Sequence, residues 1–208
     1  MSDEKGHLIL VPLLFLNLNS MSRTYCSRCA YPESSCLCSA INETQFKTRI
    51  VVLQHPSEVK HAKNTARLIS LVVPEAEIVV GETPEDFHAV RSRLETDPHA
   101  VLLYPAAESS LLSPSAEGQT IRTIVILDGT WRKAKKIWLS NTWLHEMRVC
   151  HLDEPESNYR IRRTSTPGGL ASIEAAAHAL RQLGEANTEA LLDAFAALQD
   201  KWPSNGRA

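Results

Sequence analysis

The chain has 208 residues, of which 43% are hydrophobic, and these values are typical of a globular protein with one substantial core. A formal net charge of −2 excludes a protein that is basic over its whole surface, so any contact with a nucleic acid would depend on a local group of cations. An apolar run at residues 7–16 is too short to span a bilayer, and no cleavage site follows it. We therefore expect a cytoplasmic protein with no membrane role, and the sequence indicates no obligatory protein partner.

The first twenty residues form an N-terminal extension of uncertain role. Met21 offers a second start directly before a group of cysteines. The extension is therefore either a flexible tail or an over-extended translation start, and both interpretations stay open.

Four of the five cysteines lie close together, as Cys26, Cys29, Cys36 and Cys38. Two closely spaced pairs joined by a turn can place four thiolates around a tetrahedral zinc ion. An iron–sulfur cluster and free thiols are the alternatives, whereas disulfides are disfavoured in a cytosolic chain. Four protein ligands leave no open position for a catalytic water, so this zinc would be structural. The remaining Cys150 is expected to fill the core.

The rest of the chain alternates between strand-like and helix-like segments. Strands are expected at 48–55, 76–80, 100–104, 122–127 and 147–152. Helices are expected at 57–71, from 83 onward, and at 131–139, 169–183 and 187–201, with a serine-rich loop at 106–119. Ser57 and Thr83 are the expected N-caps of the first two helices. This alternation predicts an α/β fold with a mostly parallel sheet and helices on both faces, which binds ligands at the carboxyl ends of its strands.

One strand end stands out, because the most apolar predicted strand leads directly into Asp128, Gly129, Thr130 and Trp131. The helix that follows begins with four cations, Arg132, Lys133, Lys135 and Lys136. Cations at a helix N-terminus oppose the helix dipole, which indicates an external anion such as RNA phosphate. Two simpler interpretations stay open. The aspartate could cap the helix, and the cations could form a solvated helix face.

A second basic run, Tyr159 to Arg163, precedes the pair Gly168 and Gly169. Arg160 and Arg162 would share one face of an extended segment, and a tyrosine beside them could stack on a base. The glycine pair opens a helix whose free amides could hold an anion, although it could equally form only a turn. Neither a phosphate loop nor a Gly-x-Gly-x-x-Gly motif occurs in the chain.

Several short motifs occur in an order that resembles one known family. They are the cysteine cluster, His55-Pro56-x-Glu58 with Asn64-Thr65, Tyr104-Pro105, Asp128-Gly129-Thr130-Trp131, and Ser165-Thr166 followed by Ser172-Ile173-Glu174-Ala175-Ala176. Over about residues 24–200 the chain resembles the DTW-domain family, and within it the bacterial tRNA-uridine aminocarboxypropyltransferases. These enzymes are similar in fold to the knotted SPOUT methyltransferases. The resemblance therefore implies three regions: the extension at 1–20, a zinc-binding segment at 21–45, and a SPOUT-like catalytic domain at 46–204.

The resemblance also implies a reaction. The family transfers the 3-amino-3-carboxypropyl group of S-adenosylmethionine to N3 of a uridine in the variable loop of tRNA, and releases 5′-methylthioadenosine. All three carbons on the sulfonium are electrophilic, so the pocket decides which of them meets the nucleophile. Because the N3 proton must leave as the bond forms, we expect a carboxylate to act as general base, and Asp128 is the candidate.

The implied binding residues fall into two groups. The cofactor would be bordered by Tyr104, Pro105, Leu127, Gly129, Thr130, Trp131, Gly169, Leu170 and Ser172. RNA would be met by Arg132, Lys133, Lys136, Arg160, Arg162 and Arg163. Three other functions stay open: a zinc-stabilised RNA-binding module without catalysis, an RNA methyltransferase, and an aminocarboxypropyltransferase that acts on ribosomal RNA.

Overall fold

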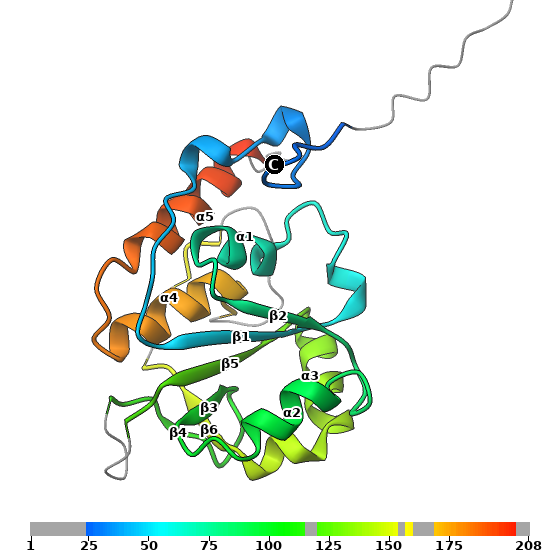
Figure 1. The fold of residues 1–208 in the computed structure, drawn as a ribbon, viewed down its shortest axis with the longest axis vertical. Coiled ribbons are helices and arrows are strands. Elements are labelled where there is room, and N and C mark those ends of the chain that lie inside the picture. Colours follow the sequence, from blue (N-terminus) through cyan, green and yellow to red (C-terminus); the bar gives the residue numbers. More distant parts are fainter. Residues whose placement is uncertain (1–23, 115–119, 154–156, 160–168, 203–208) are drawn as a thin grey trace, which may run out of the picture.

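The computed structural model describes residues 24–114, 120–153, 157–159 and 169–202. A six-stranded sheet crosses it, with the strand order β2-β1-β5-β3-β6-β4 (Figure 1). The strands are β1 (Arg49–Gln54), β2 (Glu77–Val80), β3 (Ala100–Leu103), β4 (Ser110–Leu111), β5 (Thr123–Asp128) and β6 (Arg148–His151). Every pair of neighbouring strands is parallel. The predicted α/β fold with a mostly parallel sheet is confirmed.

Helices cover both faces of this sheet. They are α1 (Thr65–Val72), α2 (His88–Leu94), α3 (Trp131–Ser140), α4 (Ser172–Gln182) and α5 (Glu189–Lys201). Successive strand residues point to opposite faces, so Ile124 packs in one core with α1, α4 and α5, while Val125 packs in a second core with α2 and α3. Figure 1 shows these two groups of helices on either side of the sheet.

Strand β5 is the centre of the arrangement, because all of its residues are buried and it lies between β1 and β3. The chain continues from β1 to β2 on one side of β5, and from β3 to β4 on the other side. Connections that diverge in this way leave a crevice at the carboxyl ends of the strands. Asp128 is the last residue of β5, and the parallel register places it beside Gln54, the last residue of β1.

The first helix begins later than the sequence pattern predicts. Residues 56–58 form a short 3-10 turn, and α1 begins only at Thr65. The N-cap of α1 is Asn64, whose side chain accepts a hydrogen bond from the backbone N–H of Arg67, so the prediction of Ser57 as its cap is wrong. Asn64 satisfies an N–H group that would otherwise lack a partner at the helix start. The residues before it are therefore not part of the helix, and several of them line the carboxyl end of the sheet.

The second helix is also displaced toward the C-terminus. Asp86 accepts hydrogen bonds from the backbone N–H groups of Glu82 and Thr83, and these bonds lower its pKa. The carboxylate therefore holds a turn, and α2 begins after it at His88, so Thr83 is not a helix cap. The loop predicted at 106–119 contains the short strand β4, and α4 begins at Ser172 rather than at 169.

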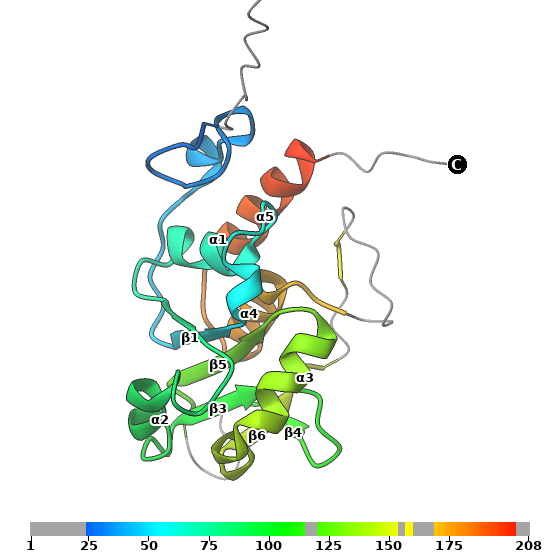
Figure 2. The same cartoon turned by 90° about the vertical axis from the view of Figure 1, so that its right-hand side faces the viewer.

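The cysteine-rich segment packs against the core that contains α1 and α5. Cys29, Tyr31 and Leu37 are buried there. Figures 1 and 2 both show the segment beside these helices. Cys150 lies in the same core, as expected. The predicted region boundaries and the knot stay predictions, and residues 1–20 lie outside the described residues. Within the described part of the chain, no helix is long and apolar enough to cross a membrane.

Shortening a buried side chain of β5 should destabilise the whole fold. Ile124 is 0% exposed at the centre of the sheet, so Ile124→Ala removes apolar contacts and leaves a cavity. We expect the free energy of unfolding, measured by urea denaturation, to fall by about 3 kcal/mol. Leu139→Ala is the control, because Leu139 is 58% exposed and its loss should change stability by less than about 0.5 kcal/mol. Equal effects of the two substitutions would contradict this description of the core.

Candidate active site and metal site

A polar cleft that is open to solvent lies at the carboxyl end of β5. Asp128 and Gly129 line it where the strand ends. The segment between β1 and α1 contributes Glu58, His61, Lys63 and Asn64, and the start of α4 contributes Ser172. Three parts of the chain that are far apart in sequence therefore meet at the edge where a parallel sheet binds its ligands.

Asp128 is only 7% exposed, and it lies between two hydrogen-bond donors. The Nε2 of Gln54 donates to Oδ2 at 2.8 Å, and the hydroxyl of Ser172 donates to Oδ1. Both oxygens act as acceptors, which is the role of an ionised carboxylate. The N-cap position of α3 belongs to Thr130, so Asp128 does not occupy the cap position. The arrangement presents a carboxylate that can accept a proton from a bound molecule.

The backbone at Gly129 lies so close to neighbouring side chains that only a glycine fits there. A Cβ atom at this position would lie 2.9 Å from the Cβ of Lys133 and 3.6 Å from the Cβ of His55. The first of these distances is shorter than real Cβ contacts allow. A residue without a side chain therefore lets β5 turn directly into α3 beside the end of β1.

The cations at the start of α3 have acidic partners within the protein. Lys133 pairs with Glu58 at 2.7 Å, and both side chains are largely buried. Lys136 pairs with Glu82 at 2.7 Å and, with a smaller contribution from His55, lowers the pKa of that carboxyl group. Two of the four cations thus meet internal anions, where the sequence pattern indicated an external one. Arg132 and Lys135 are exposed and have no ion-pair partner among the residues that the structure describes.

The predicted cofactor residues divide between the cleft and its surroundings. Gly129, Leu170 and Ser172 line the cleft together with Asp128. Leu127 is buried in the core on the α3 side, where the ring of Tyr104 stacks on Trp138 with 5.0 Å between ring centroids. The others are Gly169, which is buried, Thr130, which is half-buried, Pro105, which is exposed, and Trp131, which is 40% exposed. Arg160, Arg162 and Arg163 lie outside the described residues.

Gln54, Glu58, His61 and Lys63 belong to the site but were not among its predicted residues. The polar run that follows β1 was a visible signal for the last three, since it stands at a strand end like Asp128. Gln54 carried no such signal, because it lies inside the predicted strand at 48–55. Only the register between β1 and β5 brings it to the carboxylate.

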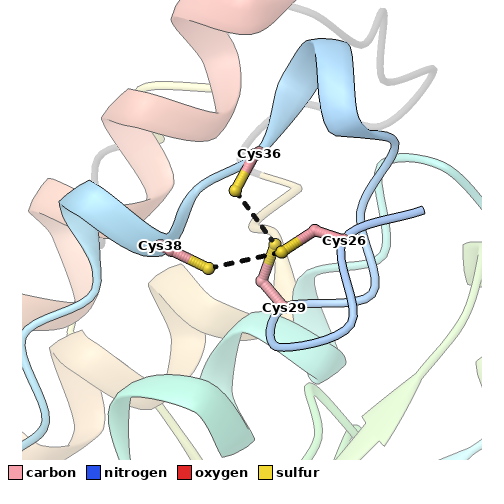
Figure 3. Close-up of side chains that lie close together, drawn as sticks. All are labelled: Cys26, Cys29, Cys36 and Cys38. Carbon is pink, nitrogen blue, oxygen red and sulfur yellow. Dashed lines mark hydrogen bonds between the residues drawn. The ribbon is translucent and has the colours of Figure 1, made fainter. Parts of the chain in front are cut away.

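The four predicted metal ligands lie together. The sulfur atoms of Cys26, Cys29, Cys36 and Cys38 are all within 4.8 Å of one another (Figure 3). Cys26 and Cys38 are 3.6 Å apart, and Cys29 and Cys36 are 3.8 Å apart. A tetrahedral ion with metal–sulfur bonds of about 2.3 Å needs sulfurs separated by about 3.8 Å. The cluster could therefore hold a metal ion, and all four ligands would come from the protein.

The electrostatics of the cluster also suit a cation. Backbone N–H groups of Cys29 and Arg28 lower the pKa of the Cys26 thiol to about 6. Burial, together with hydrogen bonds to the neighbouring thiols, raises the pKa of Cys38 to about 12. Four adjacent sulfurs cannot all carry a negative charge without a positive partner, so a bound dication would stabilise all four thiolates together.

Comparison with known proteins supports the family resemblance that the order of the motifs indicated. The family model of the DTW domain matches residues 23–203. A protein of Drosophila melanogaster named tRNA-uridine aminocarboxypropyltransferase 2 is 34% identical over 168 residues, which is 77% of this chain and 67% of that protein. Proteins of the same name from Macaca fascicularis and Mus musculus are 31% and 30% identical over 79% of this chain and 58% of their own length. The chain thus spans about three fifths to two thirds of these relatives. No solved structure matches it.

Removing a ligand of the cysteine cluster should release the metal and weaken the fold. In Cys36→Ser we expect the metal content, measured by mass spectrometry of the digested protein, to fall from about one ion per chain to near zero. The Tm should fall by roughly 5 °C or more, because the segment packs on the core through Cys29, Tyr31 and Leu37. Cys150→Ser is the control and should keep its metal. A metal-loaded Cys36→Ser protein would contradict the assignment.

Proposed function

The chain belongs to the DTW-domain family, and from this premise we propose that it is a tRNA-uridine aminocarboxypropyltransferase that uses S-adenosylmethionine as donor. The names of the relatives support the activity and the substrate class. The observation that carries the proposal to this chain is Asp128, a nearly buried carboxylate that accepts two hydrogen bonds at the central strand end of the sheet. A tRNA substrate also suits the predicted cytoplasmic location.

In the proposed reaction, N3 of a uridine attacks the carbon next to the sulfonium in the amino acid arm of the donor. A nitrogen–carbon bond forms, the carbon–sulfur bond breaks, and the electron pair of that bond stays on sulfur in 5′-methylthioadenosine. The N3 proton passes to the carboxylate of Asp128. A positioned general base of this kind contributes roughly 10²- to 10⁴-fold to a rate.

The cleft supplies surfaces for the donor next to this carboxylate. We propose that Gly129, Leu170 and Ser172 border the donor directly, since they line the same cleft as Asp128. The remaining proposed contacts are the backbone of Leu127 and the residues Tyr104, Pro105, Thr130, Trp131 and Gly169.

The exposed start of α3 is the proposed RNA surface. Arg132 and Lys135 can meet phosphates, and the partly exposed ring of Trp131 can stack on a base. Lys133 and Lys136 stay in the proposed surface, but their ion pairs with Glu58 and Glu82 also brace α3 against the segments that precede it. The proposed RNA surface also includes three residues that are assigned from the sequence alone, Arg160, Arg162 and Arg163.

We propose that the ion of the cysteine cluster is zinc. Four thiolates in a tetrahedral arrangement suit zinc, whereas magnesium and calcium prefer oxygen ligands. With Cys26, Cys29, Cys36 and Cys38 as ligands, no position remains for water or substrate. The ion would therefore stabilise the segment without taking part in the transfer.

Replacing the base should abolish transfer and spare RNA binding. The wild-type protein, incubated with S-adenosylmethionine and unmodified tRNA, should add one aminocarboxypropyl group to a uridine, as measured by mass spectrometry of digested nucleosides. We expect Asp128→Asn to lower kcat by roughly 10²- to 10⁴-fold, because an amide cannot take the proton.

Affinity for tRNA, measured by filter binding, should stay within about threefold, since the proposed phosphate contacts lie on α3. Asp193→Asn, an exposed change on α5, is the matched control. A fully active Asp128→Asn enzyme would exclude the general base. A methyl-sized mass gain would instead identify a methyltransferase, and binding without any gain would identify an RNA-binding module.

Neutralising a cation on α3 should weaken RNA binding in a salt-dependent way. We expect Arg132→Gln to weaken tRNA binding and to reduce the slope of log affinity against log salt by about one, which is the effect of one lost phosphate contact. Lys47→Gln is the control, because Lys47 is exposed before β1, at the opposite edge of the sheet. Equal slopes for Arg132→Gln and the wild type would remove α3 from the RNA surface.

A further inference from the structure

A series of buried hydrogen bonds connects the cysteine-rich segment to Asp128. The hydroxyl of Tyr31 donates to the backbone carbonyl of Asn64 at 2.5 Å. The Oδ1 of Asn64 accepts from the Nε2 of Gln54 at 3.2 Å, and the same Nε2 donates to Oδ2 of Asp128 at 2.8 Å. None of these four residues is more than 7% exposed. Water therefore has little access to replace any of these bonds.

We propose that Gln54 and Asn64 are positioning residues, which orient the carboxylate of Asp128 for proton removal, and that Tyr31 anchors them to the cysteine-rich segment. This inference rests on the proposed function, because it assigns a role to residues around the proposed base. Gln54 and Tyr31 do not line the cleft, and Asn64, which does, reaches Asp128 through Gln54, so the proposed role of all three is exerted through Asp128.

The orientation of the Asn64 amide is determined by its own contacts. Its Oδ1 caps α1 by accepting from the backbone N–H of Arg67 at 2.9 Å. Its Nδ2 donates to the carbonyl of Glu58 at 3.1 Å and to the carbonyl of Val59 at 3.3 Å. A flipped amide would direct N–H groups at the helix N–H and an oxygen at two carbonyls. Asn64 must therefore present its oxygen toward Gln54.

That oxygen in turn determines the orientation of Gln54. Its amide nitrogen has two hydrogens, and these meet Oδ1 of Asn64 and Oδ2 of Asp128. A flipped Gln54 would direct its own oxygen at two other oxygens, which costs the desolvation energy of buried polar groups without partners. The cap of α1 thus ensures that Asp128 always meets a donor on its β1 side.

The second donor on Asp128 completes the restraint. Ser172 binds the other carboxylate oxygen from the first turn of α4, so the two oxygens are held by two different elements. A carboxylate held from both sides has little freedom to rotate. This matters for a general base, because a displacement of about 1 Å can cost roughly 10²-fold in rate.

Tyr31 ties the cysteine-rich segment to the same point. The guanidinium of Arg67 lies over its ring, 5.1 Å from the centroid. Arg67 also donates to the carbonyl of Ala30 and to the carbonyl of Val59, each at 2.8 Å. The segment and the residues on both sides of Asn64 are therefore held together, so a change at Tyr31 should reach Asp128 through Asn64.

The test replaces the amide by an apolar group of similar size. We expect Gln54→Met to lower kcat for the transfer roughly tenfold to hundredfold, which corresponds to the loss of one hydrogen bond to a charged group. KM for tRNA and for S-adenosylmethionine should stay within about twofold, because Gln54 does not line the cleft. Gln199→Met, a change of another buried glutamine on α5, is the matched control and should keep kcat. Unchanged kcat in Gln54→Met would overturn the inference.

A double-mutant cycle tests the anchor. Tyr31→Phe should lower kcat severalfold. The double variant Tyr31→Phe/Gln54→Met should be no slower than Gln54→Met, because both changes act on Asp128 through the side-chain amide of Gln54. Tyr25→Phe, in the same segment but 57% exposed, is the control. Losses that multiply would show that Tyr31 acts independently of Gln54 and would overturn its role as anchor.

A crystallographic readout separates this inference from the proposed function. A wild-type protein that transfers nothing would refute the proposed function, whereas the orientation of Asp128 can be compared in wild type and Gln54→Met without any activity. We expect the carboxylate to leave its wild-type orientation in the variant, and an unchanged carboxylate would overturn the positioning role. If Gln54→Met does not fold, Gln54→Asn serves the same test, because it keeps a polar amide but is one methylene shorter, which withdraws the donors from Asp128.

Discussion

The structure depends most on how the carboxylate of Asp128 is satisfied at the end of the central strand. A nearly buried carboxylate is costly unless its oxygens are hydrogen-bonded, and here Gln54 and Ser172 meet one oxygen each. Gln54 reaches it through the parallel register of β1 and β5, and Ser172 reaches it through the packing of α4 on β5. The sheet, its neighbouring strand and a helix from the far end of the chain therefore converge on one side chain.

On α3, which follows Asp128, internal acids limit the positive charge. Glu58 and Glu82 pair with Lys133 and Lys136, so the start of α3 is less basic than its sequence suggests. This agrees with a chain whose net charge is −2. The cations of α3 without an acidic partner among the described residues, Arg132 and Lys135, form a restricted surface rather than a broad one.

The cysteine-rich segment is part of the same architecture and not a separate appendage. Its buried residues share a core with α1 and α5, and Tyr31 bonds directly to the residue that caps α1. An ion held by the four thiolates would stabilise a segment that is too short to form a core alone. The segment therefore supports Asn64, one of the residues that line the cleft.

The sequence by itself determined the fold class, the cysteine cluster and the place of Asp128 at a strand end. Apolar strands that alternate with helices need only local periodicity to be recognised, and ligand spacing is local as well. The tertiary structure alone decided where α1 begins, which acids meet the cations of α3, and that Gln54 contacts Asp128. Each of these depends on strand register or on a contact between distant segments. Side-chain patterns within one segment contain no information about such contacts.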